Sequence, residues 1–190
     1  VTEYLWHGLG FGGSCFPKDV AALRSFGRTV GEQTRMLDAV LDINTDQPLR
    51  MVALLEKELS LAGKTVAVLG LAFKPGTDDL RESPALPLVA ELRKKGAKVL
   101  VHDPIAMPHA KKRPEFRDVV FAEDWAEALR KSDACCLVTA WPEYRNIQPT
   151  NFQKLMTRAL VIDGRGVFEP AAMAAAGVVW RGVGYTPEST

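Results

Sequence analysis

The chain has 190 residues, of which 47% are hydrophobic and 25% are charged, and its formal net charge at pH 7 is +1. This length and composition predict a globular protein with one well-packed core plus an extension, and they exclude the disordered and fibrous classes. Because positive and negative charges nearly balance, we expect no nucleic acid partner and no attraction to an acidic membrane surface.

The cysteines and the hydropathy of the sequence indicate the cellular compartment. The sequence holds three cysteines, Cys15, Cys135 and Cys136, which form no disulfide framework. The adjacent pair would point to opposite faces of a strand, so we expect no metal site. These features favour a reducing, cytoplasmic compartment. The sequence shows no apolar run of membrane-spanning length and no signal peptide, so we expect no membrane association.

The first feature along the chain is a glycine-rich loop at residues 8–13, with four glycines in six positions. Glycines leave backbone N–H groups open to close approach by a ligand. Gly8, Gly10 and Gly13 literally match the dinucleotide fingerprint G-x-G-x-x-G, which requires a preceding strand. Residues 1–7 are too short and too irregular to supply that strand, so we reject this interpretation.

The loop leads into Cys15, which is followed by Pro17. Proline suits the first turn of a helix, so Cys15 should lie at or just before a helix N-terminus, where free N–H groups favour an anion. With Lys18 one turn further on, this position favours the thiolate and predicts a reactive cysteine. A buried structural cysteine is the alternative, and the local context gives the two interpretations about equal weight.

Helices follow the cysteine. Residues 18–26 predict a short helix that Gly27 ends or bends, and residues 30–59 carry a long helical pattern of apolar side chains. Pro48 should kink or break that helix within residues 44–47. So much apolar surface has no earlier domain to cover it, and we therefore expect a homodimer that forms through residues 30–59.

Strands and helices alternate from residue 65 onward. Strands are predicted at 65–69, 98–102, 119–121, 134–139, 160–162 and 178–183, with helices at 84–95, 124–130, 152–156 and 171–176. Such alternation implies right-handed crossovers. The predicted fold is therefore α/β, with a long connecting helix followed by a Rossmann-like parallel sheet that has helices on both faces.

Ligands of such sheets bind beyond the carboxyl ends of the strands. Phe73, Lys74 and Arg81 follow the first predicted strand, and Arg165 follows the fifth. An aromatic ring and three cations at one edge suit a nucleotide diphosphate, with stacking for the base and cations for the phosphates. Any one of these cations is more often a solvated surface charge, and their shared position shifts that balance only modestly.

Three segments resemble signatures of the UDP-glucose/GDP-mannose dehydrogenase family. They are GFGGSCFPKD at residues 10–19, FKPGTDDLRESPAL at 73–86 and VIDGR at 161–165. The resemblance covers nearly the whole chain but only the later portion of the family's sequence. It implies oxidation of a nucleotide-sugar alcohol to the acid, with UDP-glucose or a related UDP- or GDP-sugar as substrate, in two steps that use NAD as cofactor.

The resemblance also implies roles for single residues. Cys15 matches the cysteine that forms a thiohemiacetal and then a thioester, and Asp19 matches an aspartate that assists the water and proton steps. Lys18 and Arg81 match positions on the cofactor side of the site. The implied substrate-binding residues are Tyr4, Gly8, Gly10, Phe11, Gly12, Phe73, Lys74 and Arg165.

By the same resemblance, residues 1–60 hold the cysteine loop and the central, dimer-forming helices, and residues 61–190 form a UDP-sugar-binding domain. The family's N-terminal NAD-binding domain is absent, so we expect the later portion of a dehydrogenase, which a separate NAD-binding domain would complete. Two alternatives stay open: a non-catalytic dimeric module that holds a nucleotide sugar and, more weakly, a redox-sensing cysteine protein. Asp78, Asp79 and Glu82 are expected to fix their loop, with general acid–base work as the less favoured interpretation.

Overall fold

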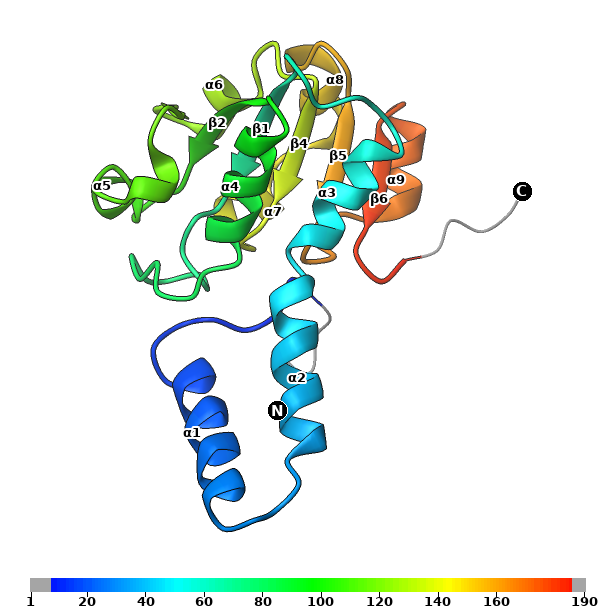
Figure 1. Cartoon of the computed structure of the whole chain (residues 1–190). Coiled ribbons are helices and arrows are strands. Elements are labelled where there is room, and N and C mark those ends of the chain that lie inside the picture. Colours follow the sequence, from blue (N-terminus) through cyan, green and yellow to red (C-terminus); the bar gives the residue numbers. More distant parts are fainter. Residues whose placement is uncertain (1–7, 186–190) are drawn as a thin grey trace.

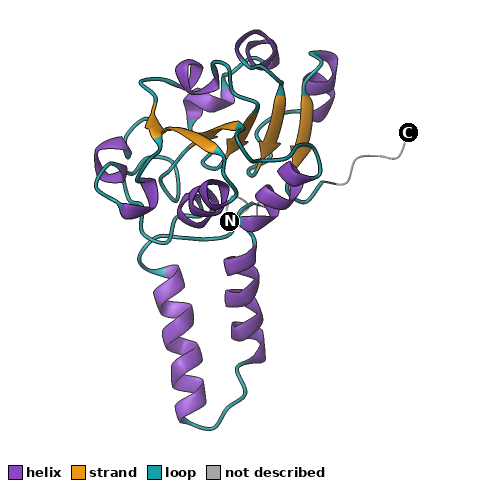
Figure 2. Ribbon diagram, turned by 45° about the horizontal axis from the view of Figure 1, so that its top comes forward, coloured by secondary structure: helices purple, strands orange, loops and turns teal. Residues whose placement is uncertain are grey.

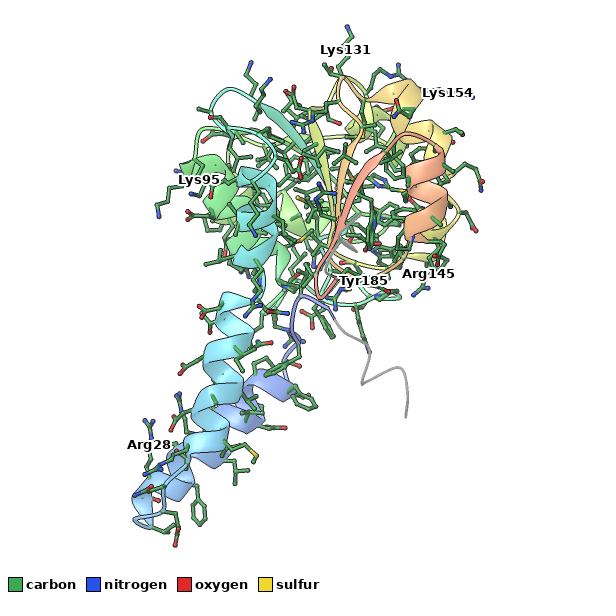
Figure 3. The ribbon with its side chains drawn as sticks, turned by 90° about the vertical axis from the view of Figure 1, so that its right-hand side faces the viewer. Arg28, Lys95, Lys131, Arg145, Lys154 and Tyr185 are labelled. Carbon is green, nitrogen blue, oxygen red and sulfur yellow. The ribbon has the colours of Figure 1, made fainter. Side chains whose placement is uncertain are left out.

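The computed structural model describes residues 8–185, in which a helical hairpin projects from a sheet domain (Figure 1). The hairpin consists of α1 (Phe16–Thr29) and α2 (Arg35–Asp46), which lie antiparallel and side by side (Figures 1 and 2). Figure 3 labels Arg28 near the hairpin's tip, far from the sheet domain. Tyr4, a predicted substrate contact, lies outside the described residues.

Helix α1 differs from its predicted bounds. It runs through Gly27 to Thr29, so Gly27 does not end the helix. A helical glycine costs only about 1 kcal/mol relative to alanine and does not block the helix sterically. A Cβ atom at Gly27 would come within 2.6 Å of the Thr34 Cγ2 atom. Glycine therefore allows the turn between α1 and α2 to pack closely on α1.

The helical pattern of residues 30–59 is interrupted, as the proline predicted. Helix α2 ends at Asp46, and α3 (Leu49–Glu56) begins directly after Pro48. Residues 30–34 form the turn of the hairpin instead of a helix. The two helices differ in burial, because α2 has no buried residue whereas α3 buries Met51, Val52 and Leu55. Only α3 therefore packs into the core of the sheet domain.

A six-stranded, wholly parallel sheet forms the centre of the sheet domain, with the order β3-β2-β1-β4-β5-β6. The strands are β1 (Thr65–Leu69), β2 (Lys98–His102), β3 (Val120–Phe121), β4 (Ala134–Leu137), β5 (Leu160–Asp163) and β6 (Val179–Gly182). This is the strand order of a doubly wound dinucleotide-binding fold. The predicted fold class is confirmed, although β4 ends two residues earlier than expected.

Helices cover both faces of this sheet (Figure 2). Helices α3 and α4 pack together on one face, and α6 packs with α8 on the other. The helices of the sheet domain that follow α3 are α4 (Ala85–Lys94), α5 (Met107–Ala110), α6 (Trp125–Leu129), α7 (Pro142–Arg145), α8 (Pro149–Leu155) and α9 (Pro170–Ala175), with a 3-10 turn at Pro114–Phe116. Helix α7 was not predicted, because four residues are too few to show a period.

The central strands form the core. Every residue of β4 is buried, including Cys135 and Cys136, and the register pairs these two cysteines with Ala67 and Val68 of β1. Burial raises the pKa of the Cys136 thiol to about 12 and raises that of Cys135 as well. Both thiols are therefore unreactive at neutral pH. Within residues 8–185, no helix is long and apolar enough to cross a lipid bilayer.

Candidate functional site

The glycine loop lies along the boundary between the hairpin and the carboxyl edge of the sheet (Figure 1). Its anchor is Leu9, whose side chain is fully buried. A Cβ atom at Gly164, directly after β5, would come within 2.6 Å of the Leu9 side chain. Gly8 is equally close to a strand end, since a Cβ atom there would lie 2.8 Å from Arg165 Nη1. The fold therefore brings two segments together that the sequence marked separately.

The second half of the loop packs against the segment that follows β1. A Cβ atom at Gly12 would overlap the carbonyl oxygen of Glu82, and one at Gly13 would lie 2.8 Å from the Phe73 ring. The Gly13 N–H donates to the carbonyl of Arg81 at 2.8 Å. Gly13 also has a positive φ of 83°, which favours glycine. Close packing inside the chain thus accounts for these two glycines.

Two polar side chains near the end of α2 also hold the loop. Asn44 Oδ1 accepts from the Phe11 N–H at 2.7 Å, and Asn44 Nδ2 donates to the Phe11 carbonyl at 3.0 Å. Gln47 Nε2 donates to the Gly8 carbonyl at 3.1 Å. Sequence reasoning missed both residues. The available signal was their spacing of three, which places two amides on one face of a helix end.

Cys15 lies at the N-cap of α1 and is exposed. Its Sγ atom is 3.6 Å from Ser14 Oγ, and its carbonyl accepts the Asp19 N–H at 2.8 Å in the first helical turn. Pro17 stands within that turn, where its missing N–H removes no helical hydrogen bond. The structure therefore excludes the interpretation of Cys15 as a buried core residue and places its thiol at a helix start, as predicted.

Lys18 and Asp19 lie beside the cysteine and form an exposed ion pair with each other. The Asp19 carboxylate raises the pKa of the Lys18 ammonium, chiefly through a hydrogen bond, and Cys15 adds a smaller contribution of the same sign. Lys18 therefore keeps its positive charge throughout the neutral range, within one helical turn of the thiol.

Arg81 is held by the carboxylate of Asp79. Arg81 Nε lies 3.0 and 3.1 Å from the two Asp79 oxygens, and Arg81 Nη2 lies 2.8 Å from Oδ2. This pairing lowers the pKa of Asp79 and raises that of Arg81. Asp78 lies 3.5 Å from His109 Nε2, at the segment after β2. Asp79 thus fixes the loop as expected of it, and Glu82 contributes a backbone with a positive φ of 52°.

The remaining predicted cations and the aromatic ring lie after β1 and β5. Lys74 is exposed, with its Nζ atom 5.5 Å from the centroid of the Phe73 ring. Arg165 is half-buried and donates from Nε to the Val138 carbonyl at 2.7 Å. Burial lowers the pKa of its guanidinium. Asp163 orients this turn by accepting the Arg165 N–H at 2.9 Å.

Asp103, which directly follows β2, bears on whether this sheet could bind a dinucleotide. In a dinucleotide-binding sheet, an acidic residue at this point binds the ribose. Here Asp103 is 1% exposed and accepts the main-chain N–H groups of Leu71 and Ala72, at 2.7 and 3.0 Å, and the Trp141 indole N–H at 3.0 Å. Its other oxygen accepts two further N–H groups, those of Ile105 and Ala106. The carboxylate is fully used within the chain, so this sheet does not fit NAD in the usual manner.

Two open grooves adjoin these residues. One of about 430 Å³ lies between the glycine loop, the α2–α3 junction and the start of α4, with Phe11, Asn44 and Arg81 in its lining. The other, of about 640 Å³, runs from Arg81 to His109. Within the part of the chain that the structure describes, no group of three or more His, Cys, Asp or Glu side chains could hold a metal ion.

Family models match both parts of this architecture. Residues 1–46 match the central domain of the UDP-glucose/GDP-mannose dehydrogenase family, and residues 67–170 match its UDP binding domain. The chain belongs to this family. The first match covers the glycine loop, α1 and α2, and the second covers the sheet from β1 to the start of α9. The resemblance of the three motifs is thereby confirmed.

Individual relatives cover nearly all of this chain but less than half of their own length. A UDP-glucose 6-dehydrogenase of Haloferax volcanii is 45% identical over 166 residues, which are 87% of this chain and 38% of that protein. One from Bacillus subtilis is 38% identical over 187 residues, which are 96% of this chain and 40% of that protein. The chain therefore spans about 40% of the length of these relatives.

Solved structures of family members share the fold. A UDP-glucose dehydrogenase from Pyrobaculum islandicum is 42% identical with a TM-score of 0.76, over 84% of this chain and 35% of that chain. An NDP-N-acetyl-D-galactosaminuronic acid dehydrogenase from Methanosarcina mazei is 29% identical with a TM-score of 0.81, over 94% of this chain and 39% of that chain. Both the hairpin and the sheet domain thus belong to a fold that the family shares.

Proposed function

We propose that this chain is the cysteine-bearing, nucleotide-sugar-binding portion of a nucleotide-sugar 6-dehydrogenase that oxidises UDP-glucose to the uronic acid. The observation that carries the proposal is the position of the glycine loop. It packs on the ends of the strands through Leu9 and Gly13, and two residues later it presents the exposed thiol of Cys15. A reactive thiol and a nucleotide site therefore adjoin each other.

The proposed substrate site uses the loop and the strand ends together. Gly8, Gly10 and Gly12 supply main chain for the sugar, and Phe11, whose own peptide groups pair with Asn44, lines the groove beside them. Phe73, Lys74 and Arg165 supply a ring and two cations for the nucleotide. Arg165 supports this assignment, because within residues 8–185 its guanidinium donates to a carbonyl from Nε alone and its buried charge favours an anionic partner. Lys74 is exposed beside the Phe73 ring, which leaves its ammonium open to a phosphate.

Cys15 carries the proposed covalent chemistry. NAD, when bound, would supply the hydride acceptor, with one NAD molecule reduced for each of the two oxidations. The Cys15 thiolate adds to the carbonyl carbon of the aldehyde and makes it tetrahedral, and the thioester left after the second oxidation is hydrolysed by water. Asp19 lies one helical turn along and can take up a proton from that water. Lys18 keeps a positive charge on the same turn.

NAD is expected to rest mainly on a separate NAD-binding domain, since Asp103 and its loop leave no dinucleotide site in this sheet. Lys18 and Arg81 are the residues of this chain that we assign to the cofactor side. We further propose a homodimer through residues 30–59, because Met36 and Ile43 of α2 are 79% and 59% exposed. A cytoplasmic location fits the proposed substrate.

The decisive experiment measures UDP-glucose binding by calorimetry and NADH formation, for this chain alone and mixed with the NAD-binding domain of a relative. We expect binding in both samples and turnover only in the mixture. Cys15→Ser should abolish acid formation and keep binding, and Arg165→Ala should weaken binding. Arg130→Ala, at the opposite edge of the sheet, is the matched control for Arg165.

Two other outcomes have clear meanings. Binding without turnover in either sample would identify a non-catalytic module that holds a nucleotide sugar. Absence of UDP-glucose binding would contradict the proposal, and rapid alkylation of Cys15 that UDP-glucose does not slow would then favour a redox-sensing cysteine.

A further inference from the structure

We propose that Asn44 is a positioning residue, which holds the glycine loop in the conformation that accepts the sugar of the substrate. The inference rests on the proposed function, because it names what shapes that same site. Asn44 lies two residues before the end of α2, on the hairpin, whereas the proposed nucleotide-binding residues lie on the sheet domain. The side chain therefore acts across the boundary between the two parts of the chain.

The geometry of the contact is a two-way pairing of one amide with one peptide unit. The Phe11 N–H donates to Asn44 Oδ1 at 2.7 Å, while Asn44 Nδ2 donates to the Phe11 carbonyl at 3.0 Å. A main-chain N–H can only donate and a carbonyl can only accept, so only one orientation of the amide satisfies both. Neither aspartate nor leucine, which resemble asparagine in size, could make this pair.

Gly10 shows that the loop is built around this side chain. It has a φ of 96°, and a Cβ atom at that position would overlap Asn44 Oδ1. Gln47, three residues after Asn44, adds a hydrogen bond to the Gly8 carbonyl. Gly8 and Phe11, which flank Leu9 and Gly10, are thus hydrogen-bonded to side chains at the end of α2. Gly10 itself has the positive φ and the missing side chain that this pairing requires.

The pairing matters for the substrate because it decides which main-chain N–H groups of the glycine loop stay without a hydrogen-bond partner among residues 8–185. Asn44 takes the N–H of Phe11, and the Arg81 carbonyl takes that of Gly13. The N–H groups of Gly10 and Gly12 have no partner within residues 8–185. Because Asn44 accepts the Phe11 N–H, the loop is held in a conformation in which the N–H groups of Gly10 and Gly12 stay available to the hydroxyl oxygens of a bound sugar. Loss of the pairing would free the loop to turn these groups away.

The test compares Asn44→Ala with Asn44→Asp and with a control, Asn151→Ala, on α8 of the sheet domain. Two quantities are measured in the full chain: the exchange rate of the Phe11 amide hydrogen by NMR, and the affinity for UDP-glucose by calorimetry. We expect Asn44→Ala to speed Phe11 exchange and to weaken UDP-glucose binding, each by about 10-fold. Amides of β1 and the Asn151→Ala protein should not change.

Asn44→Asp keeps the acceptor of the Phe11 N–H and loses the donor to the Phe11 carbonyl. We expect it to weaken UDP-glucose binding as well, because its second carboxylate oxygen would face the Phe11 carbonyl oxygen, and this variant also serves if the alanine protein fails to fold. Faster Phe11 exchange with unchanged UDP-glucose affinity would overturn the inference and leave Asn44 a purely structural residue. A wild-type chain that binds no UDP-glucose would instead overturn the proposed function, and the positioning role with it.

Discussion

The sheet domain buries many of its apolar side chains, whereas the helical hairpin leaves many of its own exposed. Helix α4 of the sheet domain buries Leu88 and Leu92 completely, whereas α1 and α2 have no buried residue. Leu23, Phe26 and Met36 of the hairpin are 57%, 62% and 79% exposed. The sheet domain therefore holds a core of its own, while the hairpin is two amphipathic helices that leave apolar side chains exposed.

The candidate site lies between these two differently packed parts of the chain. The glycine loop lies where the two parts meet, with Leu9 and Gly13 packed on the sheet domain and Phe11 tied to α2. The loop is therefore held by contacts from both parts of the chain while Cys15 stays exposed.

Cysteine reactivity separates the two parts most strongly. Cys15 is exposed at the hairpin, whereas Cys135 and Cys136 are buried in β4 with raised pKa values. We expect iodoacetamide at pH 7.5 to label Cys15 at least about 1000-fold faster than the other two, which become accessible only on unfolding. Peptide mapping by mass spectrometry measures this, with Cys15→Ser as control. Equal labelling of all three thiols would show that the sheet domain opens readily.

Truncation of one leucine in each part compares their cores. Leu88→Ala removes a fully buried side chain from α4 and should lower the free energy of unfolding by about 2–5 kcal/mol. Leu23→Ala on α1 should cost less than about 0.5 kcal/mol in dilute solution, because Leu23 is 57% exposed. Urea titrations at two protein concentrations measure both. A large cost for Leu23→Ala that grows with protein concentration would indicate a partner chain on the hairpin.

Lowering the pH should reduce the stability of the sheet domain, because the buried His102 resists protonation in the folded chain. Its ring lies 2.9 Å from the Tyr144 hydroxyl, and burial lowers its pKa below the ordinary value of 6.5. The unfolded chain therefore binds a proton that the folded chain does not, so stability present above pH 6.5 is lost as pH falls below it. We expect a loss of about 1 kcal/mol between pH 7.5 and 5.5.

Urea titrations at the two pH values measure this loss. His102→Gln should remove most of the pH dependence, whereas His109→Gln, at an exposed histidine, should keep it. The raised pKa of the nearby Glu143 acts with the opposite sign, so the difference between wild type and variant is the quantity to compare. An unchanged pH dependence in His102→Gln would refute the assignment.

The smallest effect is expected for the ion pairs of the hairpin. Asp38 of α2 lies 2.6 Å from Arg28 and 3.9 Å from Arg24 of α1. These pairs are accessible to solvent, so Asp38→Ala should destabilise the protein by less than about 0.5 kcal/mol, and the effect should fade in 1 M salt. Thermal unfolding followed by circular dichroism measures it. A cost above about 1 kcal/mol would show that the hairpin depends on this junction.

Much of the fold could be predicted, because its signals are local. The buried runs of β1 and β4 and the break at Pro48 follow from the residues at those positions alone. The position of Cys15 at a helix start followed from Pro17. Local reasoning failed at Gly27, where α1 continues because a glycine weakens a helix without blocking it, and where Thr34 of the following turn lies close to the position that a Cβ atom would take.

Local patterns along the chain are enough to predict the alternation of strands and helices, the glycine loop and the position of Cys15 at a helix start, since each depends on backbone preferences within a few residues. Which distant residues meet depends instead on the three-dimensional fold. Asn44 reaches Phe11 across 33 positions, and Leu9 is buried at Gly164. Such contacts depend on the order of the strands and on the direction of the chain after Pro48, which no local pattern specifies.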